Sequence, residues 1–205
     1  MGSRQRVAAK RENLLDLGVE QLRTSGYHGT GIQQVVGLAG IPKGSFYAYY
    51  PSKEAFAAAV VRRYAELFQA ELDRMLEASR ERPRAALRDF FDGLVERFVA
   101  NGARGGCLIG NLGAELEGTA PAVSLALRET MGAWRTAFAD VIARAQQRGE
   151  VASGRSPGLL ADFLINAWEG ALLRMKVESR VDPLRECLEL LFDELLAPSA
   201  AGPSS

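Results

Sequence analysis

The sequence predicts an all-α protein of about nine helices. Apolar residues recur at spacings of three and four along nearly the whole chain of 205 residues, as in helices that bury one face. No segment shows the strict alternation of apolar and polar residues that is typical of a half-buried strand. Segments that contain glycine or proline separate the periodic stretches, as expected for turns between helices.

Three helices are predicted in the first fifty residues. The first ends at Gly26, because glycine commonly follows the last turn of a helix. Its inner face consists of Leu14, Leu15, Gly18, Val19 and Leu22. Thr30 is a suitable N-cap for a short second helix, and Pro42 suits the first turn of a third helix that continues to Tyr50. The inner face of the second helix consists of Ile32, Val35, Val36 and Ala39.

The helical pattern continues through the rest of the chain. Ser52 is a suitable N-cap for a long fourth helix, and a fifth helix follows Pro83. A glycine-rich stretch at 101–106 precedes a short helical segment from Cys107, and a long helix follows. Two further helices are expected after the break at 153–157.

Charge is distributed unevenly along this chain of zero net charge. Residues 1–53 contain seven lysines and arginines and three acidic residues, a net charge of +4, and the remainder carries −4. The sequence therefore predicts a basic first segment that can approach phosphate and an acidic body.

Several classes of protein are not expected. No uncharged apolar run approaches the ~18–20 residues of a membrane span, and no apolar core follows the basic N-terminus as it would in a signal peptide. Cys107 and Cys187 are far apart and form no metal-binding spacing. We therefore expect a cytoplasmic protein with no membrane partner, no metal and no cofactor.

Residues 30–50 have the size of a helix-turn-helix. The third predicted helix should turn Phe46 and Tyr50 inward. Its outward residues are then Lys43, Ser45, Tyr47 and Tyr49. An ammonium group, a hydroxyl and phenols suit contacts with phosphates and base edges, and Gly44 would let the backbone approach a duplex. Composition alone leaves open that the tyrosines are half-buried core residues and that Lys43 is an ordinary solvated charge.

The local sequence resembles the N-terminal signature of the tetracycline-repressor family over residues 8 to 56. The similar residues are Thr30, Pro42 and the string KGSFYAYYPSKEAF at 43–56, preceded by the glycine-rich residues 26–31. The resemblance implies a DNA-binding domain at 1–53, a ligand-binding and dimerisation domain at 54–197 and a flexible tail at 198–205. It also implies a transcriptional regulator that binds a palindromic operator as a homodimer and responds to a small molecule. A repressor is expected, and the alternative of an activator stays open.

The resemblance further implies roles for single residues. Phosphate contacts are expected from Thr30, Tyr47 and Lys53, and contacts in the major groove from Lys43, Gly44 and Ser45. A backbone contact is expected from Tyr49, and a base or phosphate contact from Gln33 or Gln34. Pro42 departs from the family pattern, in which a small hydroxyl residue is frequent.

The last two predicted helices combine small and large apolar residues, which favours close packing against a second chain. In the similar family these helices form a four-helix dimer interface. The residues assigned to it here are Ala167, Gly170, Ala171, Leu184, Leu188 and Leu191. The alternative, that this stripe only completes the core of the monomer, stays open.

The family resemblance also implies a ligand cavity among the middle helices. The aromatic residues assigned to it are Trp134, Phe138 and Phe163. An aromatic stripe at helical spacing is by default core, and that alternative stays open.

Cys107 precedes the helical segment at 108–116 and follows Arg104 and two glycines. A thiol at a helix N-terminus is expected to have a lowered pKa and to be reactive. The segments 106–108 and 112–115, together with Lys176, resemble the branch of the family that contains the N-ethylmaleimide-reductase repressor. That resemblance implies a cysteine that senses electrophiles or oxidants, with Lys176 assisting it. The alternative is a buried structural thiol, which is the reading that suits Cys187.

An enzyme is disfavoured by the sequence. The only histidine is His28, and no Cys–His pair, Ser–His–Asp set or paired-carboxylate motif is evident. Glu115 and Glu117 are interpreted as solvated helix charges. A constitutive architectural DNA binder would not need so large a helical body. The inducer class stays open between a covalent electrophile and a noncovalent hydrophobic ligand.

Overall fold

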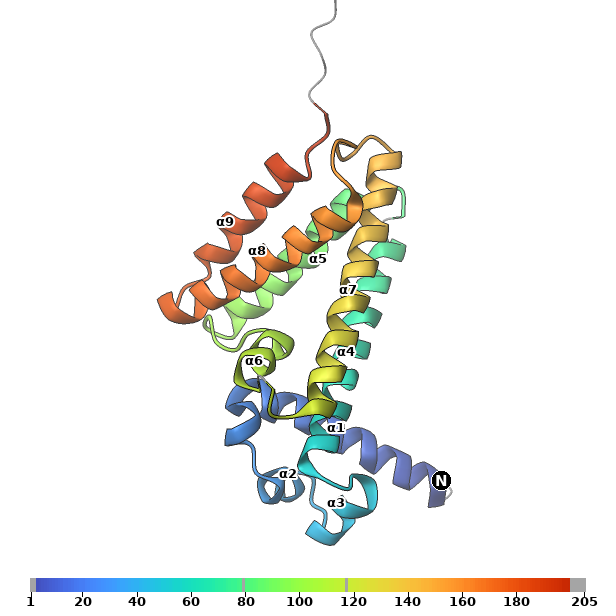
Figure 1. Cartoon of the computed structure of the whole chain (residues 1–205), viewed down its shortest axis with the longest axis vertical. Helices are drawn as coiled ribbons and strands as arrows, with labels where there is room; N and C mark the ends of the chain where they lie inside the picture. Colours follow the sequence, from blue (N-terminus) through green and yellow to red (C-terminus); the bar gives the residue numbers. More distant parts are fainter. Residues whose placement is uncertain (1–2, 79, 117, 200–205) are drawn as a thin grey trace, which may run out of the picture. The chain divides into compact units, whose positions relative to one another are not determined.

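The computed structural model describes residues 3–78, 80–116 and 118–199, and these ranges contain helices and no strand (Figure 1). The predicted all-α fold of about nine helices is confirmed. The helices of the described ranges are α1 Ser3–Gly29, α2 Ile32–Leu38, α3 Lys43–Tyr49, α4 Lys53–Ala78, α5 Pro83–Ala100, α6 Leu108–Glu115, α7 Pro121–Gln147, α8 Pro157–Glu178 and α9 Asp182–Leu190. A π-helical turn, η1 at Leu191–Leu195, continues α9 and was not expected. Most of the predicted tail, from residue 200 onward, lies outside the described residues.

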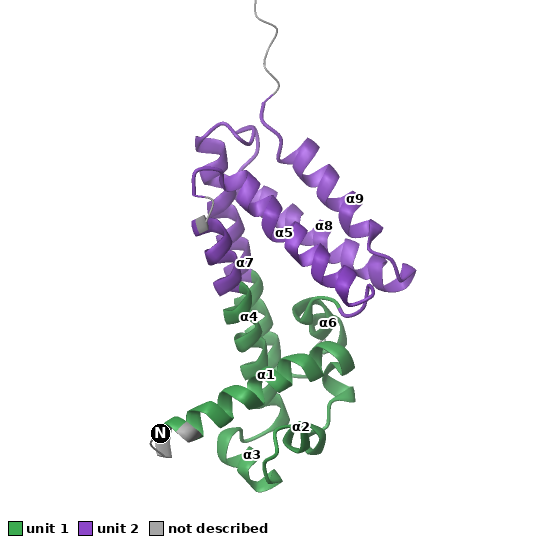
Figure 2. Ribbon diagram, turned by 180° about the vertical axis from the view of Figure 1, so that it is seen from behind, with its two compact units in different colours: residues 1–68, 106–131 green, residues 69–105, 132–205 purple. Residues whose placement is uncertain are grey.

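Two compact units make up the molecule (Figure 2). The first contains residues 1–68 and 106–131, and the second contains residues 69–105 and 132–205. The segment 106–131, which includes α6, thus belongs to the same unit as α1, α2 and α3, so the units do not follow the order of the predicted domains along the chain. The functional boundaries at 53 and 197 stay a prediction.

Local sequence signals set most helix ends. Gly26 has a φ of 70° and interrupts the helical path of α1 at the predicted place. The hydroxyl of Ser52 accepts a hydrogen bond from the Ala55 N–H at 3.0 Å, which confirms the predicted N-cap of α4. Pro42 lies at the N-cap of α3, one residue before the expected first turn.

Thr30 does not cap α2, contrary to the sequence prediction. Gly31 occupies the N-cap, with no side-chain hydrogen bond. The Thr30 hydroxyl instead donates to the Gly26 carbonyl oxygen at 2.7 Å and also lies 3.2 Å from the Gln21 carbonyl oxygen. Threonine can satisfy either the helix before it or the helix after it, and here a carbonyl of the interrupted α1 is the acceptor.

An aromatic cluster forms the core of the first unit. The Phe46 ring lies 5.3 Å from that of Phe56 and 5.9 Å from that of Tyr50, and Tyr50 and Phe56 are 5.1 Å apart. The buried residues of this unit also include aliphatic side chains of α1, α2 and α4, namely Leu14, Leu22, Val35, Val36 and Val60. The predicted inward orientation of Phe46 and Tyr50 is confirmed.

α1 approaches α4 closely at Gly18. A Cβ at this position would lie 2.6 Å from both Phe56 Cζ and Val60 Cγ2, which belong to buried side chains. We expect Gly18→Ala to lower the free energy of unfolding by about 1–3 kcal/mol, because a packed core cannot yield without strain. Denaturant unfolding measures this change.

Gly93 provides the matched control. It lies inside α5, is exposed, and a Cβ there would meet no atom within 4 Å. Gly93→Ala is therefore expected to raise the free energy of unfolding by about 0.5–1 kcal/mol through helix propensity. Equal effects of the two substitutions would contradict the close approach at Gly18.

In the second unit α5, α8 and α9 pack together (Figures 1 and 2). The Phe91 ring lies 5.0 Å from that of Trp168 and 5.6 Å from that of Phe138, so three helices meet at one aromatic cluster. Arg84 of α5 donates hydrogen bonds to the carbonyl oxygens of Phe192 and Leu196 and so satisfies the end of η1. Among the described helices, none is apolar over a stretch long enough to cross a membrane.

Candidate nucleic-acid interface and sensor residues

α2 and α3 form a helix-turn-helix whose inner faces are fixed by the aromatic cluster. Val35, Val36 and Phe46 are fully buried, and the turn between the helices contains Gly40. In both views α2 and α3 lie beside each other, next to the start of α4 (Figures 1 and 2). The rigid inner packing leaves the opposite face of α3 available to a partner.

The outward face of α3 carries the residues predicted to contact DNA. Lys43 and Gly44 are exposed, Tyr47 is 50% exposed, and Ser45 and Tyr49 are half-buried. A Cβ at Gly44 would meet no atom within 4 Å, so packing inside the protein does not require a glycine there. Because Gly44 is exposed and has no side chain, a DNA duplex could approach the backbone of α3 there, which is consistent with the predicted contact.

Two exposed glutamines lie on α2. Gln34 donates from Nε2 to Gln21 Oε1 at 2.7 Å, which orients its side chain. Gln33 is exposed. The fold thus brings Gln33 and Gln34 near the start of α2 and the lysine, serine and tyrosines onto α3.

Thr30 lies in the turn that precedes α2, and Lys53 is the first residue of α4. Thr30 is only 2% exposed and its hydroxyl donates inward, so this conformation does not support the predicted direct phosphate contact of its side chain. The Lys53 ammonium lies 4.4 Å from the centroid of the Tyr27 ring, a cation–π contact. Burial, and then the nearby Glu54 carboxylate, raise the pKa of Tyr27, so its phenol stays neutral near pH 7.

Cys107 occupies the N-cap of α6, as the sequence predicts. Its side chain is 7% exposed, and Leu108 and Ile109 beside it are buried. Cys107 belongs to the first unit, whereas Lys176 is an exposed residue of the second unit, and their partnership stays a prediction. The second cysteine, Cys187, is half-buried on α9, and burial raises the pKa of its thiol to about 11.

The aromatic residues assigned to a ligand cavity divide into two groups. Trp134 and Phe138 are buried in the second unit, where Phe138 packs in the aromatic cluster. Phe163 is 55% exposed and so lies outside the buried aromatic cluster, and its assignment to a ligand cavity stays a prediction. The helical spacing placed Phe163 among the apolar residues of α8 but did not show whether its side chain points into the core or to the surface.

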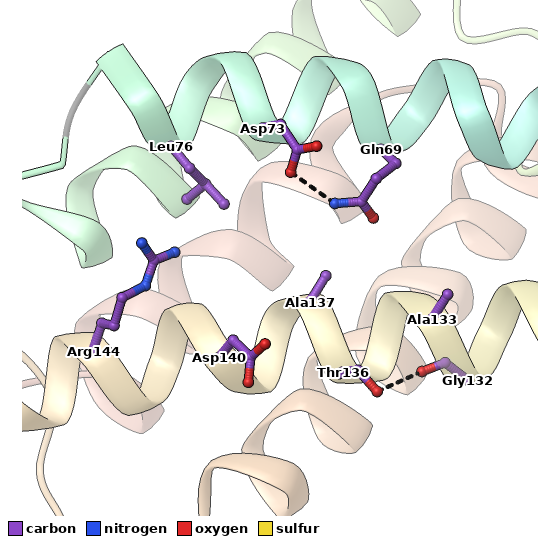
Figure 3. A pocket seen from close by; sticks show the side chains of 9 residues that line it. All are labelled: Gln69, Asp73, Leu76, Gly132, Ala133, Thr136, Ala137, Asp140 and Arg144. Atoms are coloured by element: carbon purple, nitrogen blue, oxygen red, sulfur yellow. Dashed lines mark hydrogen bonds between the residues drawn. The ribbon is translucent and has the colours of Figure 1, made fainter.

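A groove that sequence reasoning missed lies between α4 and α7 within the second unit (Figure 3). It has a volume of about 490 Å³ and is lined by Gln69, Asp73, Leu76, Gly132, Ala133, Thr136, Ala137, Asp140 and Arg144. Gln69 donates to Asp73 at 2.8 Å along one wall. Two carboxylates and a guanidinium suit a polar ligand. The sequence prediction relied on aromatic residues at helical spacing, and the described lining of this groove has none.

The residues assigned to a dimer interface also divide. Ala171, Leu184, Leu188 and Leu191 are buried within the protomer, so in this conformation a second chain cannot reach them. Ala167 is half-buried and Gly170 is exposed. The buried set belongs to the core between α8, α9 and α5, which is the alternative left open by the sequence.

A different face of α8 is apolar and exposed. Its members are Leu159, Phe163, Gly170, Leu173 and Val177, at successive spacings of four, seven, three and four residues. Leu190 on α9 is also exposed. We call the five residues of α8 the α8 stripe.

Comparison with known proteins agrees with this architecture. A family model described as "Bacterial regulatory proteins, tetR family" matches residues 14–60, and one described as "Tetracyclin repressor-like, C-terminal domain" matches residues 83–191. The chain belongs to the TetR family. This TetR-family protein is therefore a transcriptional regulator and not an enzyme. The predicted family resemblance is confirmed.

Relatives of known name resemble the TetR-family protein over most of its length. The HTH-type transcriptional repressor DhaR of Mycobacterium sp. strain GP1 is 34% identical over 186 residues, which cover 91% of this chain and 92% of DhaR. The repressor NemR of Escherichia coli K12 is 26% identical over 193 residues, 92% of this chain and 95% of NemR. A regulatory protein TetR from Rhodobacter sphaeroides has a crystal structure with a TM-score of 0.82 and 34% identity, covering 88% of this chain and 96% of that one.

Proposed function

We propose that this TetR-family regulator is a repressor that binds a palindromic operator as a homodimer and leaves it when an electrophile or oxidant modifies Cys107. The outward face of α3 is the observation that carries the DNA-binding part. Lys43 and Tyr47 are exposed on a helix whose opposite side is held by Phe46 in a packed core. Lysine and tyrosine groups on a rigid helix suit phosphate and base-edge contacts.

The α8 stripe supports the homodimer. From Leu159 to Val177 it runs over 18 residue steps, roughly 27 Å of helix at 1.5 Å per residue. Gly170 near its middle would let a second helix approach closely, with Phe163 and Leu173 to either side. A twofold arrangement through this stripe would present two copies of α3 to two operator half-sites.

Two inducer classes remain, and each rests on one feature. Covalent sensing rests on Cys107 at the N-cap of α6, because the N–H groups at a helix start favour an anionic side chain. Noncovalent sensing rests on the groove between α4 and α7, whose Asp73, Asp140 and Arg144 favour a polar ligand over the hydrophobic one expected from the sequence. We favour the covalent class, because the cysteine also fits the predicted similarity to NemR-type repressors.

Substitutions on α3 test the DNA-binding proposal. We expect Lys43→Ala and Tyr47→Phe each to weaken binding to a palindrome that the wild-type protein selects from random-sequence DNA. If Lys43 contacts a phosphate, its loss should also flatten the dependence of log K on log salt concentration by about one unit. Fluorescence anisotropy at several salt concentrations measures both effects, and thermal unfolding should be unchanged because both side chains are exposed.

Arg155→Ala is the control for this experiment. Arg155 is an exposed residue of the second unit, in the break before α8, and its loss removes the same charge as Lys43→Ala. It should leave operator affinity and salt slope unchanged. Wild-type affinities for both α3 variants at matched salt would show that another surface binds DNA.

A further inference from the structure

The carboxylate of Glu115, at the end of α6, is bound to the turn that follows the long segment of α1. Its Oε2 accepts a hydrogen bond from the Tyr27 N–H at 2.7 Å, and its Oε1 accepts one from the His28 N–H at 2.6 Å. The sequence interpretation of Glu115 as a solvated charge is therefore wrong, and Glu117 lies outside the described residues. A carboxylate that receives two backbone N–H groups makes hydrogen bonds of the stronger, charge-assisted kind.

The backbone around Gly26 makes room for this carboxylate. Gly26 has a φ of 70°, a conformation that side chains disfavour, and it ends the regular part of α1. A Cβ on Gly26 would lie 2.5 Å from Glu115 Oε2. The glycine thus serves both the turn and the close approach of the carboxylate, which indicates a specific contact and not a chance meeting of surface groups.

The same turn positions the groups proposed to bind DNA. Thr30 bonds back to Gly26, and Gly31 is the N-cap of α2, so the path from Gly26 sets where the helix-turn-helix begins. The ring of Tyr27 also lies under the Lys53 ammonium, a predicted phosphate contact. By binding the amide of Tyr27, Glu115 therefore fixes the start of α2 and the position of the ring that makes the cation–π contact with Lys53.

We propose that Glu115 is a positioning residue for DNA binding, which acts by holding the turn at 26–31 in the geometry that α2, α3 and Lys53 need to meet the duplex. The proposal rests on the proposed operator binding. Glu115 lies in the predicted ligand-binding domain at 54–197, and the proposal gives it a role in the predicted DNA-binding domain at 1–53. All the contacts that carry it lie within the first unit.

The test replaces Glu115 by glutamine and by aspartate. Glutamine keeps the length but can accept only one of the two N–H groups, and its amide N–H group then faces the other. Aspartate keeps the charge but is one methylene too short to reach both. Glu66→Gln is the matched control, since Glu66 is an exposed carboxylate of the same unit that forms an ion pair with Arg63.

Three measurements are made on the full-length protein. Hydrogen exchange of the Tyr27 and His28 amides reports the clamp directly, because exchange of a bonded amide requires its local opening. Anisotropy with the palindrome selected by the wild type reports operator affinity, and thermal unfolding reports overall stability. Loss of one charge-assisted hydrogen bond corresponds to roughly a tenfold change in an equilibrium.

The proposal expects both Glu115 variants to exchange these two amides about tenfold faster and to bind the operator about tenfold more weakly, while the melting temperature falls by only a few degrees, the size expected for loss of one such hydrogen bond. Glu66→Gln should behave as wild type. Unchanged exchange at Tyr27 and His28 would overturn the clamp. Faster exchange with wild-type operator affinity would overturn the positioning role. If the wild type selects no DNA, the proposed function fails and the positioning role with it, while the exchange result still decides whether the carboxylate holds the turn.

Discussion

Phe163→Glu and Leu173→Glu are each expected to convert the regulator into monomers that no longer bind a palindromic site. Both side chains are more than half exposed in the protomer, and both lie on the α8 stripe. In a dimer formed through this stripe, each substitution buries an unpaired carboxylate in both chains, which costs several kcal/mol by order of magnitude. Sedimentation velocity measures the mass, and anisotropy measures operator binding.

Two further variants separate loss of the dimer from loss of the fold. Val99→Glu places the same charge on an exposed apolar residue of α5 outside the stripe, and it should remain dimeric. Ala171→Glu places it on a residue buried within the protomer and should lower the melting temperature, because the charge enters the core. A Phe163→Glu protein that sediments as a tight dimer would place the interface on another face.

Cys107→Ser is expected to abolish release from the operator by a thiol-reactive electrophile. Treating the wild type with 1,4-benzoquinone or N-ethylmaleimide should lower operator affinity by a factor of roughly 5–150, the usual range of allosteric coupling. Cys107→Ser should bind the operator equally well before and after treatment. Anisotropy before and after removal of the excess reagent measures both.

Cys187→Ser is the internal control, and its expected behaviour follows from the pKa of that thiol. Burial raises this pKa to about 11, so at pH 7 only about one thiol in 10⁴ is a thiolate, the form that reacts. Alkylation of Cys187 should therefore be slow at pH 7 and rise about tenfold per pH unit toward 11. Cys187→Ser should respond to the electrophile as wild type does.

The result that would contradict covalent sensing is release of Cys107→Ser by the same treatment. In that case a noncovalent ligand in the body, with the polar groove as the described candidate site, would be the surviving account. The limited exposure of Cys107 should also affect the rate at which reagents modify it, because a bulky reagent reaches the thiol only after local opening around α6. A small electrophile should therefore react faster than a bulky one of equal intrinsic reactivity.

Local sequence signals, which depend on a few neighbouring residues, were sufficient to predict much of the structure of the DNA-binding head. Ser52 caps α4 and Gly26 interrupts α1 at the predicted places, because a cap and a left-handed glycine act within about one helical turn. Phe46 and Tyr50 point inward as their spacing of four predicts. The signature at 43–56 was specific enough to identify the family.

Residues whose environment depends on distant parts of the chain could not be assigned in this way. Thr30 could accept a hydrogen bond from an N–H of α2 or donate one to a carbonyl of α1, and in the structure it donates to Gly26. α8 is apolar around most of its circumference, so periodicity could not distinguish Ala171, which is buried, from Phe163, which is exposed.

The sequence by itself determined the all-α class, the helix-turn-helix, the outward residues of α3 and the place of Cys107 at a helix start. Each of these follows from periodicity or capping over short spans of chain. Only the tertiary structure decided which face of α8 remains open to a partner and where Glu115 makes its hydrogen bonds. The Tyr27 amide that Glu115 holds is 88 residues away, and a contact at that separation arises from the packing of α6 on α1, which no local pattern encodes.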